Sequence, residues 1–282
     1  MLADHDRRNQ KIMKWLGLFL MGAFVLLYLI PVFGVVLTSL KTNAEISQRG
    51  IWTLSGDTTF DNYITAWTDS PIKRYLWNTV LVTVPAVVLS IAGGSLLGYA
   101  IAVLKPRGRT VLLLVVVGGL FVPPQVLLVP LFRIFSNAGL INTLWPMILI
   151  HSAIGLAITT LLMSNFFSQV PESLREAAIV DGANEGTVFT KIMIPLARPS
   201  LAALATLQFA FIWNDFLYPL VFTSTDNTRT IMLGLIALRG QFAVAHGSQA
   251  AVAVMASLPT VLVFLFFQKQ FIRGLTAGAT KG

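Results

Sequence analysis

The sequence predicts an all-α polytopic membrane protein with six transmembrane helices. Hydrophobic residues make up 55% of the 282 residues and charged residues only 11%, whereas soluble domains carry roughly a quarter charged residues. Apolar runs of about 20 residues, enough to cross a bilayer, recur six times. Because backbone that faces lipid must satisfy its own hydrogen bonds, these runs are expected to be helices. The whole chain, residues 1–282, is expected to be a single membrane domain.

The expected transmembrane helices cover residues 15–40, 76–104, 110–134, 141–167, 199–222 and 249–272. The first run follows a basic start but is longer than the apolar core of a signal peptide, so it is expected to remain as a helix. Prolines inside the runs do not argue against helices, because transmembrane helices tolerate them. The longer polar connections are loops 41–75, 168–198 and 223–248.

The distribution of Lys and Arg predicts the orientation, because cytoplasmic loops carry the excess of these residues. With both termini in the cytoplasm, loops 41–75 and 223–248 are external and loop 168–198 is cytoplasmic. The cytoplasmic segments then hold 13 of the 20 Lys and Arg residues, namely Arg7, Arg8, Lys11, Lys14, Lys105, Arg107, Arg109, Arg175, Lys191, Arg198, Lys269, Arg273 and Lys281. This orientation explains the net charge of +8 without a nucleic-acid partner.

Two absences narrow the function. The chain has no cysteine, which excludes thiol catalysis, disulfides and Cys-ligated metals. It also lacks the Gly-x-x-x-x-Gly-Lys-Ser/Thr phosphate loop, so an ATP-driven step would need another polypeptide. The chain has three histidines in all, and the expected spans contain one acidic residue, Asp215. The sequence therefore offers no catalytic pair or metal site. A membrane enzyme is therefore disfavoured.

A polar stretch from Pro171 to Pro195 separates the fourth and fifth apolar runs. Its pattern predicts a helix, a glycine bend and a second short helix. Pro171 suits a first helical position, and Gly182 suits the position that follows a helix end. Asn184 can cap the second helix, which Pro195 is expected to end.

Small and acidic residues in this stretch predict a docking surface. Ala178 and Gly182 are four residues apart and are expected to share a face, with Ala177 beside them, where a partner backbone can approach closely. Glu176 and Asp181 offer charges to a basic partner. The alternative is an amphipathic helix on the inner leaflet, which the acidic residues disfavour because anionic lipid repels them.

The same stretch resembles a known motif. Residues 176–178 read EAA, Gly182 follows after three residues, and the letters I-x-I-P follow nine residues later at 192–195. This spacing resembles the EAA signature of permease subunits of bacterial ABC importers, with Ile194 in place of the usual Leu. The stretches Val122 to Leu149 and Phe211 to Leu220 look like the maltose-type carbohydrate-uptake branch.

The resemblance covers nearly the whole chain and implies the type I importer permease (MetI-like) fold. In that fold the EAA helix is a cytoplasmic coupling helix between transmembrane helices 4 and 5, seated in a cleft of an ATPase. The residues expected to couple this chain to the ATPase are Glu172, Arg175, Glu176, Ala177, Ala178, Asp181, Gly182, Ile192 and Pro195.

The resemblance also implies the partners. They are a second homologous permease subunit, two ATP-binding cytoplasmic subunits, an extracytoplasmic solute-binding protein and the surrounding lipid bilayer of the bacterial cytoplasmic (inner) membrane. ATP and Mg would be used by the ATPase, and this chain would bind no cofactor or metal. The permease itself is expected to be non-catalytic and to move its solute by alternating access.

Polar residues inside the spans are candidate solute contacts. Gln125, His151 and Asp215 lie at similar depths in three different helices, past the midplane toward the outside. Around Asp215, a 3–4 spacing predicts one face that carries Gln208, Phe211, Asp215 and Tyr218. Carboxylate and amide groups bind sugar hydroxyls, and an aromatic ring covers the apolar face of a pyranose.

Each candidate also has a structural alternative. Asp215 can serve only to bond across helices or to the paired subunit, and His151 can be an interhelical donor. Gln125 can satisfy backbone groups that the neighbouring prolines leave free. In the external loops, where the family docks its binding protein, the exposed candidates are Asp226, Arg229 and Gln241.

The predicted function is import of a sugar or oligosaccharide as an ABC permease. Another solute remains open: a polyamine would want several acids and a glycerol phosphate would want Arg in the cavity, and the sequence places neither. An ion-coupled secondary transporter usually shows inverted repeats and paired intramembrane ionisable groups, and the sequence shows neither of these.

Overall fold

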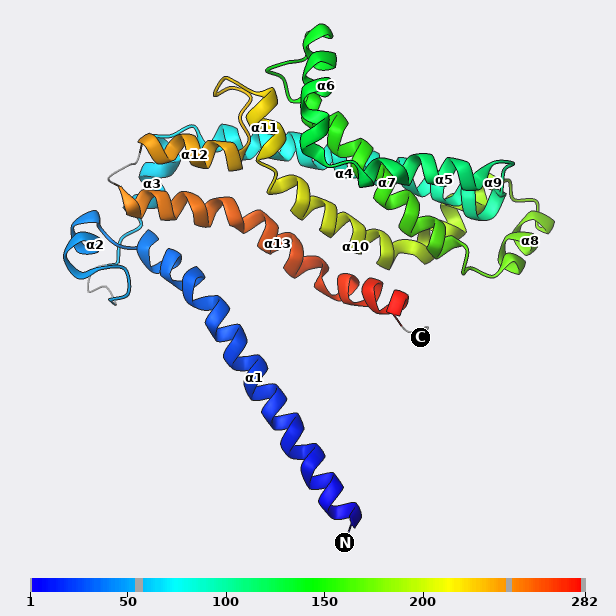
Figure 1. Ribbon diagram of the computed structural model, residues 1–282, viewed down its shortest axis with the longest axis horizontal. Helices are drawn as coiled ribbons and strands as arrows, with labels where there is room; N and C mark the ends of the chain where they lie inside the picture. Colours follow the sequence, from blue (N-terminus) through cyan, green and yellow to red (C-terminus); the bar gives the residue numbers. More distant parts are fainter. Residues whose placement is uncertain (1, 54–57, 242–244, 280–282) are drawn as a thin grey trace. The chain divides into compact units, whose positions relative to one another are not determined.

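The computed structural model describes residues 2–53, 58–241 and 245–279, with side chains described for 11–53, 58–238 and 245–270 (Figure 1). Every regular element among these residues is a helix. In chain order they are α1 Leu2–Ser39, α2 Asn43–Arg49, α3 Asp61–Thr68, α4 Ile72–Tyr99, η1 Ala100–Leu104, α5 Arg109–Gly118, η2 Gly119–Phe121, α6 Pro124–Asn137, α7 Trp145–Phe167, α8 Glu172–Val180, α9 Glu185–Val188, η3 Phe189–Met193, α10 Ile194–Trp213, α11 Leu217–Phe222, α12 Ile231–Gln241 and α13 His246–Ala279. The all-α prediction is confirmed for the described residues.

Five of the described helices are long and apolar enough to cross a membrane. They cover Lys11–Ser39, Ile72–Leu104, Trp145–Phe167, Glu185–Trp213 and His246–Gln270. A sixth span results if Arg109–Phe121 and Pro124–Asn137 are taken together, although these two helices are bent by 100° at their junction. The expected transmembrane segment over residues 110–134 is broken at Pro123 and Pro124 into α5 and α6.

The fifth expected helix, over residues 199–222, also differs from the structure. α10 ends at Trp213, and the separate helix α11 begins at Leu217. At the other end, the apolar helix starts earlier than expected, because α9, η3 and α10 follow one another without interruption from Glu185. The two loops that are expected to be external, 41–75 and 223–248, contain α2, α3 and α12.

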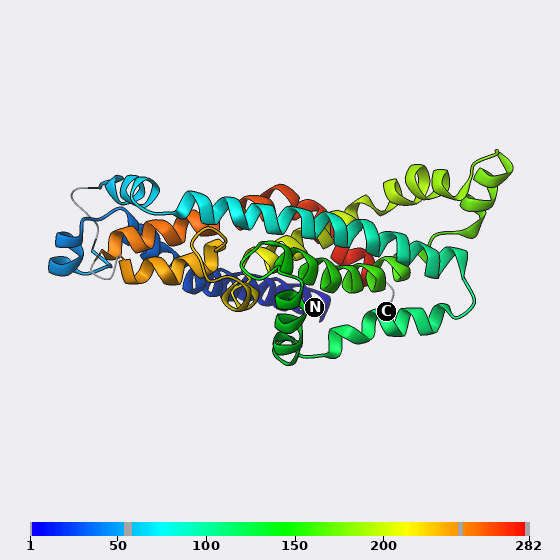
Figure 2. The ribbon, with the colours of Figure 1, turned by 90° about the horizontal axis from the view of Figure 1, so that it is seen from above.

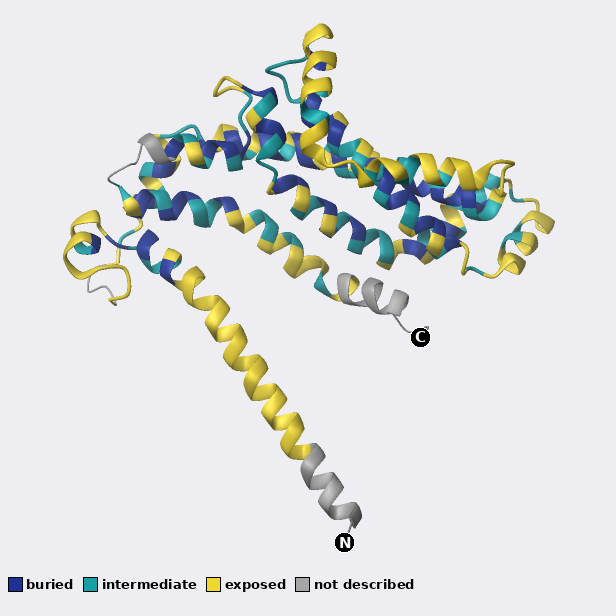
Figure 3. Ribbon diagram, viewed as in Figure 1, coloured by how far each residue is buried: buried dark blue, intermediate teal, exposed yellow. Residues whose placement is uncertain are grey.

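The chain forms two compact units. Unit 1 comprises residues 1–70 and 238–255, and unit 2 comprises residues 71–237 and 256–282. In unit 1, the side chains of residues 11–33 on α1 are exposed, as Figure 3 shows along the length of this helix. An apolar helix whose side chains are exposed in this way is suited to a lipid or protein environment.

Unit 1 is held together at the end of α1 by the buried Lys41. Its Nζ donates to the carbonyl oxygen of Ile51 at 2.8 Å and to that of Thr53. Asn62, on α3, donates to the carbonyl oxygens of Ser39 and Lys41 at 3.0 and 2.8 Å. A buried ammonium that is surrounded by carbonyl oxygens keeps its hydrogen bonds, so the segment after α1 is fixed onto α3.

Unit 2 is built on the pairing of α4 with α7, which lie side by side (Figure 1 and Figure 2). Glycines on the facing surfaces allow this close approach. A Cβ added at Gly98 would lie 2.9 Å from the backbone nitrogen of Ser164, and one added at Gly155 would lie 2.7 Å from Cβ of Ser90. Small residues at helix contacts are typical of membrane proteins, because association there depends on packing rather than on water exclusion.

Among the described residues of unit 2, two apolar clusters position the site. One lies around Val82, Met147, Ile212 and Phe222. The other lies at the end of unit 2 that carries α8, called the α8 end below, and includes Tyr99, Met163, Phe167, Val188 and Met193. The second cluster packs directly against the polar stretch that interrupts the apolar pattern of the sequence.

Candidate functional site

The end of α8 is closed by a glycine turn. Gly182 has φ +85°, and its backbone N–H donates to the carbonyl oxygen of Ile179 at 3.0 Å. The N–H of Ala183 donates to the carbonyl oxygen of Ala178 at 2.9 Å. This pair of bonds is a Schellman motif, in which glycine adopts the left-handed conformation without a Cβ penalty. The predicted helix stop at Gly182 is confirmed.

The second helix begins as predicted but does not end where expected. The Asn184 side chain accepts a hydrogen bond from the N–H of Thr187 at 2.9 Å, as a helix cap does. Pro195 does not end the helix, because it lies in the first turn of α10. The π-helical turn η3, from Phe189 to Met193, directly precedes α10. A widened turn there provides a helical path past a proline that lacks an N–H.

The outward face of α8 carries the small and acidic residues. Glu176, Ala177 and Asp181 are exposed, as is Val180, whose exposed fraction is 86%. Ala178 instead is half-buried and packs against the apolar cluster at the α8 end. Gly182 lies beyond the helix end, so Ala178 and Gly182 do not share a helical face. Of the small residues in the predicted docking surface, Ala177 is the one that points outward on the helix.

The inward side of α8 is tied to α4 through a carboxylate. Arg175 forms an ion pair with Glu185, and Glu185 accepts a hydrogen bond from the Tyr99 hydroxyl at 2.6 Å. The hydrogen bond to Glu185 raises the pKa of the Arg175 guanidinium above its ordinary value. The Tyr99 ring packs edge-on against Phe167, with centroids 5.8 Å apart. One chain of contacts therefore runs from α8 to the ends of α4 and α7.

His151 and Asp215 are brought together from α7 and from the junction between α10 and α11. His151 Nε2 lies 3.0 Å from Asp215 Oδ2, and the two side chains are only 11% and 12% exposed. The Tyr218 ring lies edge-on against the imidazole, with centroids 5.3 Å apart. The expectation that His151 and Asp215 lie at similar depth agrees with this contact.

Asp215 also organises the helix break. Its Oδ1 accepts from the backbone N–H of Leu217 at 3.0 Å, and its own N–H donates to the carbonyl oxygen of Ile212. The carboxylate thus caps the short helix α11. An open hollow of about 680 Å³ lies beside it and is lined by Leu207, Ala210, Phe211, Asn214, Asp215, Phe216 and Leu217.

Gln208 and Gln125 lie apart from this cluster. Gln208 is buried, donates to Thr159 Oγ1 at 2.7 Å and accepts from the Ser90 hydroxyl. Gln125 lies exposed in the first turn of α6. Because α10 ends at Trp213, the expected single face from Gln208 to Tyr218 does not exist. Phe211 lies on the hollow with Asp215, whereas Gln208 joins α10 to α4 and α7.

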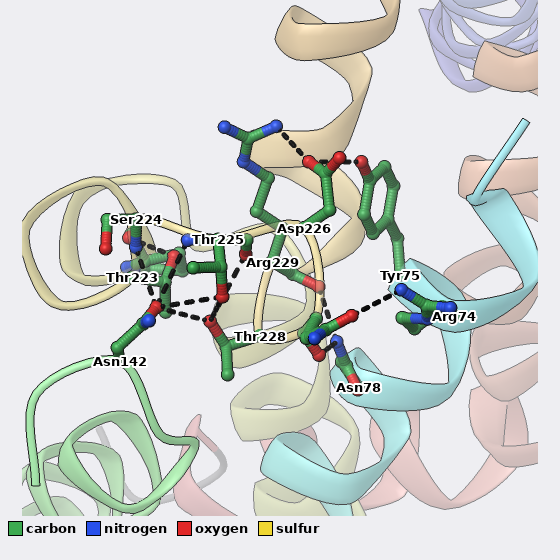
Figure 4. A network of polar contacts seen from close by, with 12 residues as sticks. Arg74, Tyr75, Asn78, Asn142, Thr223, Ser224, Thr225, Asp226, Thr228 and Arg229 are labelled. Atoms are coloured by element: carbon green, nitrogen blue, oxygen red, sulfur yellow. Dashed lines mark hydrogen bonds and ion pairs between the residues drawn. The ribbon is translucent and has the colours of Figure 1, made fainter.

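A polar network fixes the segment between α11 and α12 (Figure 4). The side-chain oxygen of Asn142 accepts from the backbone N–H groups of Ser224 and Thr225 at 3.0 and 3.1 Å. On the other side of the segment, Asp226 pairs with Arg229 and accepts from the Tyr75 hydroxyl at 3.1 Å. Two of the external-loop candidates, Asp226 and Arg229, thus bond each other. The side chain of Gln241 lies outside the described residues.

Sequence reasoning did not single out Tyr99, Glu185 or Asn142. Arg175 and Glu185 are opposite charges on either side of the glycine bend, which is a signal that could have suggested their pairing. Tyr99 gives no such signal, because its partner is 86 residues away. Asn142 has φ +64°, a conformation that asparagine adopts more readily than most residues.

The sequence is similar to a described family. The profile described as "Binding-protein-dependent transport system inner membrane component" matches residues 94–277. The arabinooligosaccharides transport system permease protein AraQ of Halalkalibacterium halodurans is 34% identical, over 98% of this chain and 99% of that protein. The diacetylchitobiose uptake system permease protein NgcG of Streptomyces coelicolor is 32% identical, over 98% and 90% of the two chains.

Solved structures show the same fold. A chain of a bacterial ABC transporter involved in the import of the acidic polysaccharide alginate superposes with a TM-score of 0.80 and 25% identity, over 94% of this chain and 98% of that chain. A chain of the alginate transporter in complex with a pentasaccharide-bound periplasmic protein gives 0.64 at 18% identity, over 90% and 92% of the chains. The expected type I importer permease fold is confirmed.

The long apolar helices agree with the matched family, which is described as an inner-membrane component, and together they indicate a multi-pass inner-membrane protein. The match covers well over half of the chain, and the relatives extend over nearly all of it. The chain belongs to the family of inner-membrane components of binding-protein-dependent transport systems, the permease subunits of ABC importers.

Proposed function

We propose that this permease imports a sugar or oligosaccharide, which an extracytoplasmic binding protein delivers and which a separate ATPase drives across the membrane. The observation that carries the proposal is the surface formed by α8 and the glycine turn that follows it, called the α8 unit below. Its outward face combines Ala177, Glu176 and Asp181 in exposed positions with a rigid glycine turn. Such a face is suited to a protein cleft, where a small residue allows close approach and the acids meet basic groups.

In the proposed orientation, the α8 end is cytoplasmic and both termini lie inside. Lys105, Arg107 and Arg109 flank the turn between η1 and α5, near α8, which agrees with the excess of basic residues on the cytoplasmic side. α8 would then contact one of two ATP-binding subunits. ATP and Mg would be bound by those subunits, and the expected coupling residues of this chain remain Glu172, Arg175, Glu176, Ala177, Ala178, Asp181, Gly182, Ile192 and Pro195.

The contacts behind α8 suggest how force is transmitted. When the two ATPases close on ATP, the clefts would move α8 of this chain and the equivalent helix of a second permease subunit. Arg175 and Glu185 connect α8 to α9, and the Tyr99 hydroxyl connects Glu185 to α4. A displacement of α8 would therefore move the helix pair α4 and α7 as a body, as alternating access requires.

The relatives support a carbohydrate as solute. Those named above are permeases for arabinooligosaccharides and diacetylchitobiose, and MelC of Bacillus subtilis, 33% identical over 90% of this chain, is a melibiose/raffinose/stachyose import permease. In this chain the hollow beside Asp215 offers an exposed aromatic ring, Phe211, and an exposed amide, Asn214. These groups suit the apolar face and the hydroxyls of a pyranose.

We select among the candidate solute contacts by asking which side chains line the hollow beside Asp215. Phe211 and Asp215 line the hollow. His151 contacts the Asp215 carboxylate, and the Tyr218 ring packs against His151. Gln208 is committed to helix contacts, and Gln125 lies on another helix. We therefore propose Phe211, Asn214 and Asp215 as the residues through which this subunit contacts the solute, with His151 and Tyr218 positioning Asp215.

Reconstitution tests the proposal. The chain is purified with the second permease, the ATP-binding subunits and the binding protein encoded beside it, and uptake of labelled oligosaccharides into proteoliposomes is measured. We expect uptake that requires both ATP and the binding protein. Uptake that persists without ATP and follows an ion gradient would contradict the proposal.

A further inference from the structure

A second cavity lies at the α8 end of unit 2, separate from the outward face of α8. Its volume is about 390 Å³. The turn between η1 and α5, the last turn of α7 and the first turn of α8 line it, and these segments lie at the same end of the unit in both views (Figure 1 and Figure 2). The polar side chains that line it include Lys105, Arg109, Thr110, Asn165, Glu172 and Arg175.

The charges of this cavity are predominantly positive. Three cations, Lys105, Arg109 and Arg175, face one carboxylate, Glu172. Arg175 is engaged by Glu185. Lys105 Nζ lies 3.3 Å from Glu172, but both side chains are at least half exposed, and such pairs bind weakly. Within the described residues, the Arg109 guanidinium has no hydrogen bond or ion pair.

The backbone adds further donors to the same cavity. α5 begins at Arg109 after Gly108, which has φ +82° and provides no side-chain cap. The N–H of Arg109 donates to the carbonyl oxygen of Pro106 at 3.1 Å, so the first-turn N–H groups that remain for a ligand are those of Thr110 and Val111. Such groups at the start of a helix favour an anion. Lys105 has φ +51°, which is uncommon for a residue with a long side chain. This tight turn brings Lys105 and Arg109 to one cavity.

The cavity lies where an apolar helix meets a polar surface. No residue of α5 is buried in the structure. Val111, Leu114 and Val115 are 64%, 66% and 70% exposed. An apolar face of this kind is suited to acyl chains, and a basic pocket at its polar end lies at the level of lipid headgroups.

We propose that this cavity binds the phosphate of an anionic phospholipid. The Arg109 guanidinium and the N–H groups of Thr110 and Val111 hold the phosphate, Lys105 contributes a second cation, and the acyl chains lie along the exposed face of α5. The inference rests on the proposed orientation, which places the cavity at the cytoplasmic leaflet, where anionic lipids attract basic residues. Because Lys105 also contacts Glu172, a bound lipid would compete with a residue of the α8 unit.

Lipid binding to the purified full-length chain tests this site. Fluorescent phosphatidylglycerol is titrated against the chain in neutral detergent, with unlabelled phosphatidylglycerol, phosphatidylcholine or inorganic phosphate as competitor. We expect phosphatidylglycerol to displace the probe and the other two to fail. Displacement by inorganic phosphate at an equal concentration of phosphate would overturn the lipid assignment in favour of a soluble phosphate ligand.

A matched pair of variants localises the binding. Arg109→Gln should weaken phosphatidylglycerol binding about fivefold, because one basic residue near an anionic surface contributes roughly that factor. Arg107→Gln removes the same charge two residues away, outside the cavity lining, and should change binding by less than about twofold. Equal weakening in the two variants, or none in either, would overturn the proposal.

A separate measurement checks that the Arg109 variants are folded. The unfolding temperature without lipid should be the same for wild type and Arg109→Gln, and Arg109→Lys should keep part of the affinity because it keeps the charge but not the planar fork. If Arg109→Gln does not fold, Lys105→Gln takes its place with the same expected weakening. The assay needs no ATPase or solute, so its failure is distinguishable from a failure of the proposed transport function.

Discussion

Gly182 is the residue at which backbone conformation matters most in the proposed coupling surface. Its φ of +85° is required by the turn that ends α8. Gly182→Ala should cost about 1–2 kcal/mol of local stability, because a Cβ is unfavourable in the left-handed conformation. We expect α8 to fray and uptake to fall several-fold, measured in cells with the amount of permease in the membrane held equal.

Gly186→Ala is the matched control. Gly186 lies in α9 with no positive φ, and an added Cβ would meet only Asn184 Oδ1, at 3.4 Å. Alanine there should be neutral or stabilise α9 by up to about 1 kcal/mol. Equal uptake by the two variants would show that the turn at Gly182 is not needed for coupling.

A substitution at Gln208 distinguishes a structural role of this side chain from a role in solute binding. Gln208→Leu should destabilise the protein by about 1–3 kcal/mol, because the buried Ser90 and Thr159 hydroxyls lose a partner. The measurement is thermal unfolding together with the KM for the solute. Gln125→Leu, at an exposed position, is the control and should leave unfolding unchanged. An unchanged unfolding temperature with altered solute KM in Gln208→Leu would instead place Gln208 in the solute path.

For single residues, the sequence predicted the depth of a side chain within a span better than the neighbour toward which it points. Counting residues from the helix ends placed His151 and Asp215 at one level, because a helix rises 1.5 Å per residue, and the two side chains are in contact. The orientation of Gln208 could not be predicted in the same way. It depends on the glycine-lined packing of α4 and α7 and on the end of α10 at Trp213.

At the scale of elements, the contact between α9 and α4, which links α8 to α4 through Arg175 and Glu185, is the part most open to a direct test. The Tyr99 hydroxyl is a single atom that joins α4 to Glu185. Tyr99→Phe should lower the free energy of unfolding by about 1.5–3 kcal/mol, which is the contribution of a hydrogen bond to a charged group. We expect solute uptake by the reconstituted complex to fall more than its ATP hydrolysis does, because the motor would then move α8 without moving α4.

Tyr28→Phe provides the comparison for this prediction. Tyr28 lies on α1 and is 66% exposed, so loss of its hydroxyl should leave the ratio of solute moved to ATP hydrolysed unchanged. A normal ratio in Tyr99→Phe would mean that the hydrogen bond to Glu185 does not transmit force.

The positions at which helices break could not be predicted from the sequence. Hydropathy identifies apolar residues but not the direction of the chain, so the run across Pro123 and Pro124 reads as one span although the chain turns by 100° there. The break before α11 depends on Asp215, whose carboxylate caps the new helix. At Pro195 the opposite error arises, because the helical path continues past a residue that usually ends helices.

For the whole molecule, the low share of charged residues and the six apolar runs of about 20 residues were sufficient to predict a helical membrane protein. The EAA spacing then indicated the family, which the similarity to known permeases confirms. The sequence of one chain does not say what covers its exposed surfaces. The apolar side chains of α1 and the outward face of α8 are examples, since both are exposed in the structure.

Site-directed crosslinking is the most direct test of the central claim that α8 docks on a separate ATPase. The chain contains no cysteine, so Ala177→Cys and Ala178→Cys each introduce a single reactive thiol into the assembled transporter. Because Ala177 is exposed and Ala178 faces the apolar cluster, we predict that Ala177→Cys crosslinks efficiently to an ATP-hydrolysing subunit and Ala178→Cys crosslinks weakly. Capture of lipid alone from Ala177→Cys, with no ATP-hydrolysing protein, would contradict the claim.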